Sequence, residues 1–411
     1  MTLPFDLSFR KILIGIGLVI LAIGLGFGIY LTFFATAPSE PVTSVPEKTG
    51  TGLTTGGLPL SGIAEQKPGE ETVTEGTGAT TGLPQSQTVL SSSLTITPAQ
   101  NTTLSSDGNA MQYYDSISGL FYKVDTNGSL TPLSSKTFYQ VQNATWSNDK
   151  NKAVLEYPDG SNIIYDFATD SQTTLPKHWE DFEFAPNNNK IIAKSIGTDP
   201  SSRWLVVSDT NGANAEAIYA LGENADKVQI AWSPNDQVVG FSATGDATTE
   251  FGTQEIYLLG KNKENLKSLK VPGFDFSAKW ADEGDRVFYS VTSPNDGYKP
   301  TLWAVDASGE NIGANAVKIG LNTWIDKCAV ISGYRAYCAV PKSLDDGAGF
   351  DRRLGATSDD VFYLVDFRTG NKTFIAEPDT DYSVNQISVD ANENYIYFTD
   401  TVTGALHKIE I

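Results

Sequence analysis

Aromatic and charged residues recur in the segments that lead into apolar runs and in the loops between those runs. The residues suited to binding a ligand are Trp179, Asp181, Arg203, Asp226, Asp275, Trp324, Asp326, Arg352, Asp381 and Tyr382. Trp, Tyr and Arg dominate the energetic hot spots of protein interfaces, so this set predicts contact with a protein or peptide. A structural alternative stays open, because Trp also packs between sheets and Asp also caps turns.

Catalysis by carboxylates is a second hypothesis, in which Asp181, Asp226 and Asp326 would serve a hydrolase or lyase. The sequence contains no G-x-S-x-G nucleophile motif, and its only histidines are His178 and His407. Neither a Ser-His-Asp triad nor a zinc site can be assembled convincingly from so few histidines. We therefore expect a non-enzymatic protein that uses no cofactor.

Acidic loops leave calcium as an open alternative. Asp345, Asp346 and Asp351 lie close together in SLDDGAGFD, and Asn295 and Asp296 lie in SPNDGY. Neither segment has the ligand spacing of a calcium-binding loop that ends in Glu. Solvated turn carboxylates are favoured, and we predict no metal site.

Cys328 and Cys338 are the only cysteines, and they are symmetric about Gly333 in a predicted hairpin. A hairpin would place them opposite each other on neighbouring strands, so we expect a disulfide if this part of the chain lies outside the cytoplasm. The alternative is a pair of buried thiols. The spacing is not that of a C-x-x-C oxidoreductase motif.

A repeated sequence motif, here called the repeated phrase, indicates which secondary-structure elements position these residues. Copies begin at Trp146 (WSND), Phe184 (FAPN), Trp232 (WSPND) and Trp280 (WADEGD), with weaker copies at Leu104 and Val389. Each copy lies between two β-like runs, which predicts the tip of a hairpin. A third run ends at an Asp and a tight turn, and a fourth closes the unit. We expect the three repeated tryptophans to pack between neighbouring units, because recurrence at equivalent positions needs a shared structural cause.

Four antiparallel strands per unit, with almost no helical periodicity, are typical of a β-propeller blade. Landmarks at 104, 146, 184, 232, 280, 328 and 389 predict seven blades, the one at 328 from spacing alone; six or eight blades stay open. The last unit has only three strands, so we expect residues 93–98 to supply its fourth and close the ring. The predicted fold is all-β, a seven-bladed propeller of four-stranded antiparallel blades over residues 93–411.

The phrases WSPNDQ and VDxxTG resemble the TolB-type, WD40-like (PD40) propeller repeat of bacterial envelope proteins, over roughly residues 93 to 411. The resemblance implies the fold directly and function only weakly. It implies a ring whose relatives mostly bind peptides or proteins at one mouth of the central channel, or gate a fused peptidase.

An apolar segment precedes the repeats. Residues 12–37 contain no charged side chain, and this length exceeds the roughly 20 residues that cross a membrane as a helix. A cleaved signal peptide is the alternative, since Ala35-Thr36-Ala37 resembles a cleavage site. Arg10 and Lys11 predict a cytoplasmic tail over residues 1–11. Residues 38–92, rich in Gly, Thr, Ser and Pro, predict a disordered linker to an outward-facing propeller.

The net charge of −20 excludes nucleic acid as a favoured partner, because a polyanion repels phosphate backbones. We therefore predict a membrane-tethered binding or scaffolding module for an envelope protein or peptide. A glycan- or cell-wall-binding module is a further alternative, with the rim aromatics as stacking surfaces. The oligomeric state stays open.

Overall fold

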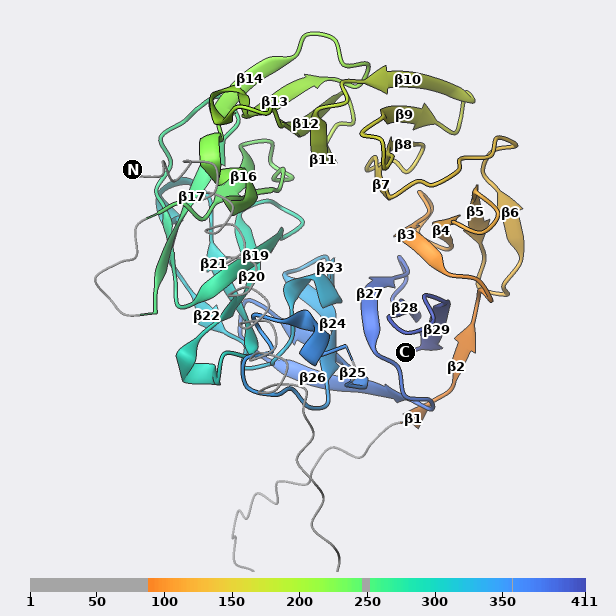
Figure 1. Cartoon of the computed structure of the whole chain (residues 1–411). Coiled ribbons are helices and arrows are strands. Elements are labelled where there is room, and N and C mark those ends of the chain that lie inside the picture. The colour runs from red at the N-terminus through yellow and green to blue at the C-terminus, as the bar shows by residue number, and fades with distance from the viewer. Residues whose placement is uncertain (1–87, 246–251, 357) are drawn as a thin grey trace, which may run out of the picture. The chain divides into compact units, whose positions relative to one another are not determined.

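Runs of β-branched and aromatic residues between Asp- and Gly-containing turns form the strands of this protein. The computed structural model describes residues 88–245, 252–356 and 358–411. Its strands form seven separate sheets, and five of the sheets are continuous in sequence with their strands in chain order. The sheets stand side by side around a common centre (Figure 1).

Blades 1 to 3 each have four antiparallel strands. Blade 1 contains β3 (Ala99–Leu104), β4 (Met111–Asp115), β5 (Leu120–Val124) and β6 (Leu130–Pro132). Blade 2 contains β7 (Asn143–Trp146), β8 (Lys152–Glu156), β9 (Asn162–Asp166) and β10 (Ser171–Leu175). Blade 3 contains β11 (Trp179–Phe184), β12 (Lys190–Ser195), β13 (Trp204–Asp209) and β14 (Glu216–Ala220).

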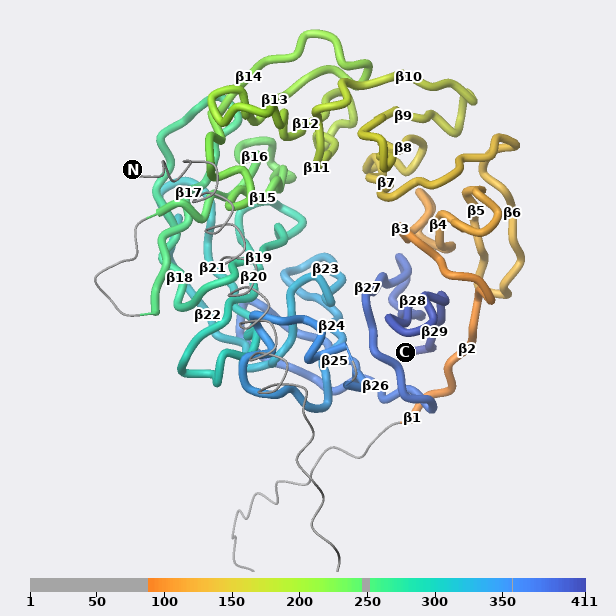
Figure 2. The backbone as a smooth tube through the Cα atoms, in the orientation of Figure 1, coloured from red at the N-terminus to blue at the C-terminus, as the bar shows by residue number. Residues whose placement is uncertain are grey.

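Blades 4 and 5 follow the same plan. Blade 4 contains β15 (Val228–Ile230), β16 (Val238–Ser242), β17 (Gln254–Gly260) and β18 (Leu269–Val271). Blade 5 contains β19 (Phe274–Trp280), β20 (Arg286–Thr292), β21 (Pro300–Asp306) and β22 (Val317–Lys318). In each blade the first strand is innermost and the fourth is outermost (Figures 1 and 2).

Blades 6 and 7 combine strands from both ends of the described chain. Blade 6 contains β23 (Cys328–Ile331), β24 (Arg335–Pro341), β25 (Asp360–Asp366) and β26 (Lys372–Pro378), with β1 (Thr88–Val89) as a fifth strand. Blade 7 contains β27 (Val384–Val389), β28 (Tyr395–Asp400) and β29 (Leu406–Glu410), with β2 (Ser91–Ser93) as its fourth strand. The predicted seven-bladed, four-stranded architecture is therefore confirmed.

Short 3-10 helices lie only in the connections among the described residues. They are η1 (Pro200–Ser202), η2 (Gly222–Lys227), η3 (Pro294–Asp296), η4 (Gly309–Asn311), η5 (Ile325–Lys327) and η6 (Arg352–Leu354). None of the helices in residues 88–245, 252–356 and 358–411 has the length and hydropathy of a membrane span. The predicted span at 12–37 and the linker up to residue 87 lie outside the described residues.

The repeated phrase forms the turn between the first and second strands of a blade. In blade 2 the Ser147 hydroxyl accepts a hydrogen bond from the Lys152 amide at 3.0 Å and donates one to Asp149 at 2.6 Å. Ser233 makes the equivalent bond with the Val238 amide in blade 4. The small polar residue after the landmark aromatic residue thus fixes the hairpin tip.

The landmark tryptophans join each blade to the preceding one, as predicted. The Trp146 indole donates to the Asn101 carbonyl of blade 1 at 2.8 Å, and the Trp280 indole donates to the Ala231 carbonyl of blade 4 at 2.9 Å. Trp232 is buried in a cluster with Ile192 of blade 3. Trp side chains suit this place because they fill the gap between sheets while the indole N–H finds a backbone acceptor.

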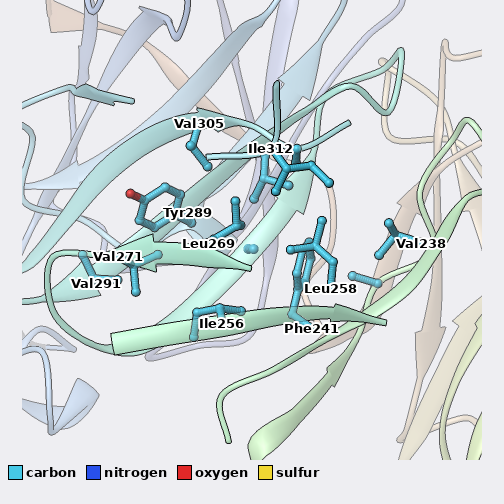
Figure 3. Packing of buried hydrophobic residues seen from close by; sticks show 14 residues of the cluster. Val238, Phe241, Ile256, Leu258, Leu269, Val271, Tyr289, Val291, Val305 and Ile312 are labelled. Carbon is cyan, nitrogen blue, oxygen red and sulfur yellow. The ribbon is translucent and has the colours of Figure 1, made fainter. Parts of the chain in front are cut away.

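The core consists of a chain of such inter-blade clusters rather than one central core. Figure 3 shows the cluster between blades 4 and 5, where Phe241 and Ile256 pack with Tyr289 and Val305. The innermost strands of the blades surround the centre of the ring. Side chains on these strands are therefore the ones that a ligand in the channel would contact.

Ring closure uses residues slightly earlier than predicted. Ser91 to Ser93 pair with Ile409 to His407 in antiparallel register, whereas the next residues, 94–98, form the connection to β3. In the same stretch β1 pairs in parallel with Glu377 and Pro378 at the edge of blade 6 (Figure 2). The regular pairing ends at Ser93 because the chain then turns: the Leu94 and Thr95 amides both donate to the Leu406 carbonyl, and Pro98 has no N–H with which to extend the strand. Residues 88–92 are thus strand except at Leu90, within the range assigned to the linker.

Candidate ligand-binding face and channel

The antiparallel order of the strands divides the connections into two sets. The loops from second to third strand and the connections between blades gather at one end of the ring, here called the loop face. The repeated phrases and the turns from third to fourth strand gather at the other end, the turn face. Long loops on a rigid scaffold are the usual place for binding.

Exposed apolar side chains are concentrated at the loop face. Among the described residues eleven large apolar side chains are exposed, and eight of them lie in loops or strand ends of this face: Ile96, Ile117, Tyr139, Phe274, Tyr298, Phe350, Leu354 and Val402. The other three are Leu90, Leu130 and Tyr257, in outer strands or between them. Concentration on one face is what distinguishes an interaction surface from scattered surface apolar residues.

The longest insertion, residues 342–359 of blade 6, folds onto the corresponding loop of blade 5. The Gly347 amide donates to the Gly297 carbonyl and the Gly349 amide to the Tyr298 carbonyl, both at 2.9 Å. The rings of Tyr298 and Phe350 lie 5.4 Å apart. The two loops therefore present their exposed aromatic side chains from one ordered surface.

Arg352 ties this insertion to the connection between blades 5 and 6. Its guanidinium forms a two-pronged ion pair with Asp326, with one bond of 2.9 Å, and lies 5.4 Å from the centre of the Trp324 ring. Below it, the buried Lys327 ammonium is 2.7 Å from both carboxylate oxygens of Asp360. Bidentate Arg–carboxylate geometry fixes orientation as well as contributing energy.

Two of the predicted carboxylates occupy β-bulges. Asp181 and Asp275 have φ values of 55° and 53°, and each lies at a register shift between the first and second strands of its blade. Asp tolerates this left-handed conformation better than most residues, and a bulge redirects a side chain. The Asp181 carboxylate extends to the buried Lys194 ammonium at 2.7 Å.

The central channel contains a cavity of about 550 Å³ lined by the innermost strands of blades 2 to 5 and by η5. Asp181 and Asp326 line it near the loop face, with Glu183 and Lys279 among the other charged lining residues. Burial raises the pKa of Glu183 to about 7, and burial lowers the pKa of Lys279 to about 8. Both shifts reflect the cost of holding a charge away from water.

Sequence reasoning missed Glu183 and Lys279, although a signal was present. Glu183 and Lys279 directly precede the landmark aromatic residues of their blades, Phe184 and Trp280. At the same position, blades 1, 2, 4 and 7 have the small residues Thr, Thr, Ala and Ser. An ionisable residue at an otherwise small position on an inner strand would have indicated the channel.

The ten predicted rim residues do not form one site. Asp181 and Asp326 line the channel, whereas Asp226 and Asp275 line a separate pocket of about 480 Å³ between blades 4 and 5. Burial raises the pKa of Asp275, against the opposing effect of the nearby Arg352. The three carboxylates of the hydrolase or lyase hypothesis are therefore split between two pockets.

The remaining predicted residues have structural partners. Arg203 donates to the Gly197 carbonyl at 3.1 Å and lies 3.8 Å from Glu223. Asp381 lies 3.5 Å from the Lys342 ammonium.

The aromatic part of the predicted rim needs correction. Trp179 and Trp324 are 6% and 4% exposed, so neither offers a stacking surface. Trp179 begins β11 and packs with Val154 between blades 2 and 3, because the strand entrance turns its ring inward. Tyr382 is half-buried against Phe398 and His407.

A disulfide joins Cys328 to Cys338, which lie directly opposite each other on β23 and β24. Both cysteines are fully buried against blade 5. Within the described residues no three His, Cys, Asp or Glu side chains are grouped closely enough to hold a metal ion.

No protein-family model matches this chain, and no curated protein matches its sequence. Solved structures with the same fold include an oligogalacturonate lyase in complex with manganese, at 15% identity and a TM-score of 0.56, covering 80% of this chain and 94% of that one. The oligogalacturonate lyase of Vibrio parahaemolyticus follows at 12% identity and a TM-score of 0.54, covering 79% and 94%. The Cps50 (Swd1) propeller domain of Myceliophteria thermophila has 9% identity and a TM-score of 0.52, covering 78% and 100%. At these identities the similarity shows the propeller fold alone.

Proposed function

We propose that this chain is a binding module that captures a protein or peptide at its loop face, as part of a membrane-tethered envelope protein with TolB-type repeats. The observation that carries this proposal is the gathering of eight of the eleven exposed large apolar side chains at one end of the ring. Three of them, Tyr298, Phe350 and Leu354, belong to the two loops of blades 5 and 6 that fold together, and the loop of blade 6 also carries Arg352. Aromatic residues with Arg are the composition of interface hot spots.

The proposal is tested by site-specific photo-crosslinking of the full chain in intact cells. A benzophenone amino acid replaces Tyr139 or Phe350 on the loop face, or the exposed Asn127 on the turn face as a matched control. Adducts to a protein from both loop-face positions, and none from Asn127, are expected. Equal labelling from both faces, or no protein adduct from the loop face, would contradict the proposal.

The outward placement of the propeller has its own test. An oxidising compartment preserves the Cys328–Cys338 disulfide, whereas the cytoplasm reduces accessible cysteine pairs. Acid-quenched cells are alkylated before and after reduction, and the mass of the chain reports the redox state. Two free thiols in freshly quenched cells would contradict this placement without bearing on the loop face.

A glycan ligand is a distinguishable outcome of the same experiment. Loop-face positions that label cell-wall material instead of protein would favour a glycan-binding module. With Trp179 and Trp324 buried, its stacking surfaces would be exposed loop-face aromatics, of which Tyr139 and Phe350 are the most accessible at 73% and 59% exposed.

A further inference from the structure

The channel cavity holds two ionisable side chains that have no ion-pair partner among the described residues. Glu183 projects from β11 of blade 3, and Lys279 projects from β19 of blade 5. Both strands face the centre of the ring (Figure 1). The cavity they share, about 550 Å³, lies within the size range of small-molecule sites.

Glu183 has unused hydrogen-bonding capacity. One carboxylate oxygen accepts the Trp232 amide at 2.8 Å, a bond that links blade 3 to blade 4. The other oxygen has no protein partner in the described part of the chain, and a carboxylate can accept about four hydrogen bonds in total. The group is therefore anchored on one side and open on the other.

Lys279 is anchored in the same manner. Its ammonium donates to the Cys328 carbonyl at 2.7 Å and to the Asp326 carbonyl at 3.3 Å, which links blade 5 to blade 6. An ammonium has three N–H donors, so one remains. Neither backbone oxygen neutralises the positive charge.

The other charged residues of the cavity are already matched. Asp181 pairs with Lys194 at 2.7 Å, and Asp326 pairs with Arg352. Neither Glu183 nor Lys279 forms an ion pair, although the charge of the Asp326 carboxylate also acts on Lys279. They remain one acid and one base without a counter-charge in contact. Both side chains are half-buried, and a charge held partly away from water without a counter-charge in contact is unfavourable, so each group favours a ligand atom of opposite charge.

We infer that the channel binds a small zwitterion of the amino-acid class, with its ammonium group at Glu183 and its carboxylate at Lys279. The ligand supplies both missing counter-charges and adds no net charge to the cavity. This inference rests on the channel alone and does not depend on the loop-face partner.

The inference is tested with the full chain in detergent by isothermal titration at pH 7.5. The probes are glycine, 4-aminobutyrate and 6-aminohexanoate, which separate the two charges by increasing distances. Hexylamine and hexanoate are the matched probes that carry only one of the charges. At least one zwitterion is expected to bind tenfold or more tightly than either single-charge probe.

Glu183→Gln and Lys279→Gln remove one charge each while keeping hydrogen-bonding groups toward the backbone partners. Each is expected to weaken zwitterion binding at least tenfold, which corresponds to about 1.4 kcal/mol. Glu410→Gln and Lys270→Met make the same charge changes at exposed positions outside the channel and are expected to leave binding unchanged.

Three results would overturn the inference: no binding of any zwitterion, equal binding of hexylamine or hexanoate, or unchanged affinity in a folded Glu183→Gln variant. Thermal unfolding establishes that each variant is folded. If Lys279→Gln unfolds, the Glu183→Gln variant and the single-charge probes still decide the question.

Discussion

Reducing the Cys328–Cys338 disulfide should destabilise the propeller by a calculable amount. The bridge closes a loop between residues separated by ten positions, and both cysteines are fully buried. The chain-entropy relation gives about 2.7 kcal/mol at 25 °C for a loop of this length, because the crosslink restricts the unfolded chain. Reduction replaces the S–S bond with two S–H groups and removes no heavy atom, so the loss of the crosslink is the main change that the experiment measures.

The assay is urea unfolding of the full chain, followed by tryptophan fluorescence, with and without reductant. With a slope of about 3 kcal/mol per molar urea, a loss of about 2.7 kcal/mol lowers the midpoint by about 1 M. A Cys328→Ala, Cys338→Ala double variant is the control, and reductant should not change its midpoint. An unchanged midpoint for the reduced wild-type chain would refute the assignment of stability to this hairpin.

Three further predictions concern stability. His407 is buried, with neither ring nitrogen hydrogen-bonded among the described residues, and burial lowers its pKa despite the opposing charge of Asp400. The free energy of unfolding is therefore not reduced by His407 above the ordinary histidine pKa of about 6.5. It decreases as the pH falls below that value, because the unfolded chain takes up the proton more readily; unfolding measured at pH 7.5 and at pH 5 tests this. Trp232→Ala should cost about 3 to 5 kcal/mol by urea unfolding, through lost packing against blade 3. Lys327→Met should cost about 3 to 5 kcal/mol, because it leaves the Asp360 carboxylate buried without a counter-charge.

Each of these predictions has a control. A His407→Leu variant should lose part of the acid sensitivity, and an identical pH slope would contradict the role of this imidazole. The exposed Tyr139→Ala variant should change stability by less than about 0.5 kcal/mol, in contrast to Trp232→Ala. A Lys327→Met, Asp360→Leu double variant should recover much of the loss; a sum of two independent losses would contradict coupling of the pair.

The blades could be predicted because their landmarks are local. A Trp or Phe before a Ser or Ala, followed by a polar turn, recurs because each blade needs the same hairpin tip and the same contact with its neighbour. The turn bonds of Ser147 and Ser233 are contained within a few residues, so the sequence carries them completely.

The channel and the rim depend on contacts that no local pattern records. Arg352 meets Asp326 only because the insertion at 342–359 folds across to blade 5, and no repeated unit supplies a template for that insertion. Trp179 and Asp181 are separated by one residue, yet a bulge sends the carboxylate to the channel while the indole is buried. Alternation along a regular strand could not have predicted this difference.

The clasp between β2 and β29 also has a consequence for how the ring forms. Thr95 and Leu406, which are hydrogen-bonded beside the clasp, lie 311 positions apart in sequence. During synthesis the first partner leaves the ribosome long before the second exists, and joining such distant segments carries a large loop-closure cost. The six earlier blades can therefore pack one after another, whereas blade 7 cannot be completed until its three carboxy-terminal strands have been synthesised. We therefore expect the ring to close late in folding, and a chain truncated before residue 406 would be an open arc with unpaired edges that invite aggregation.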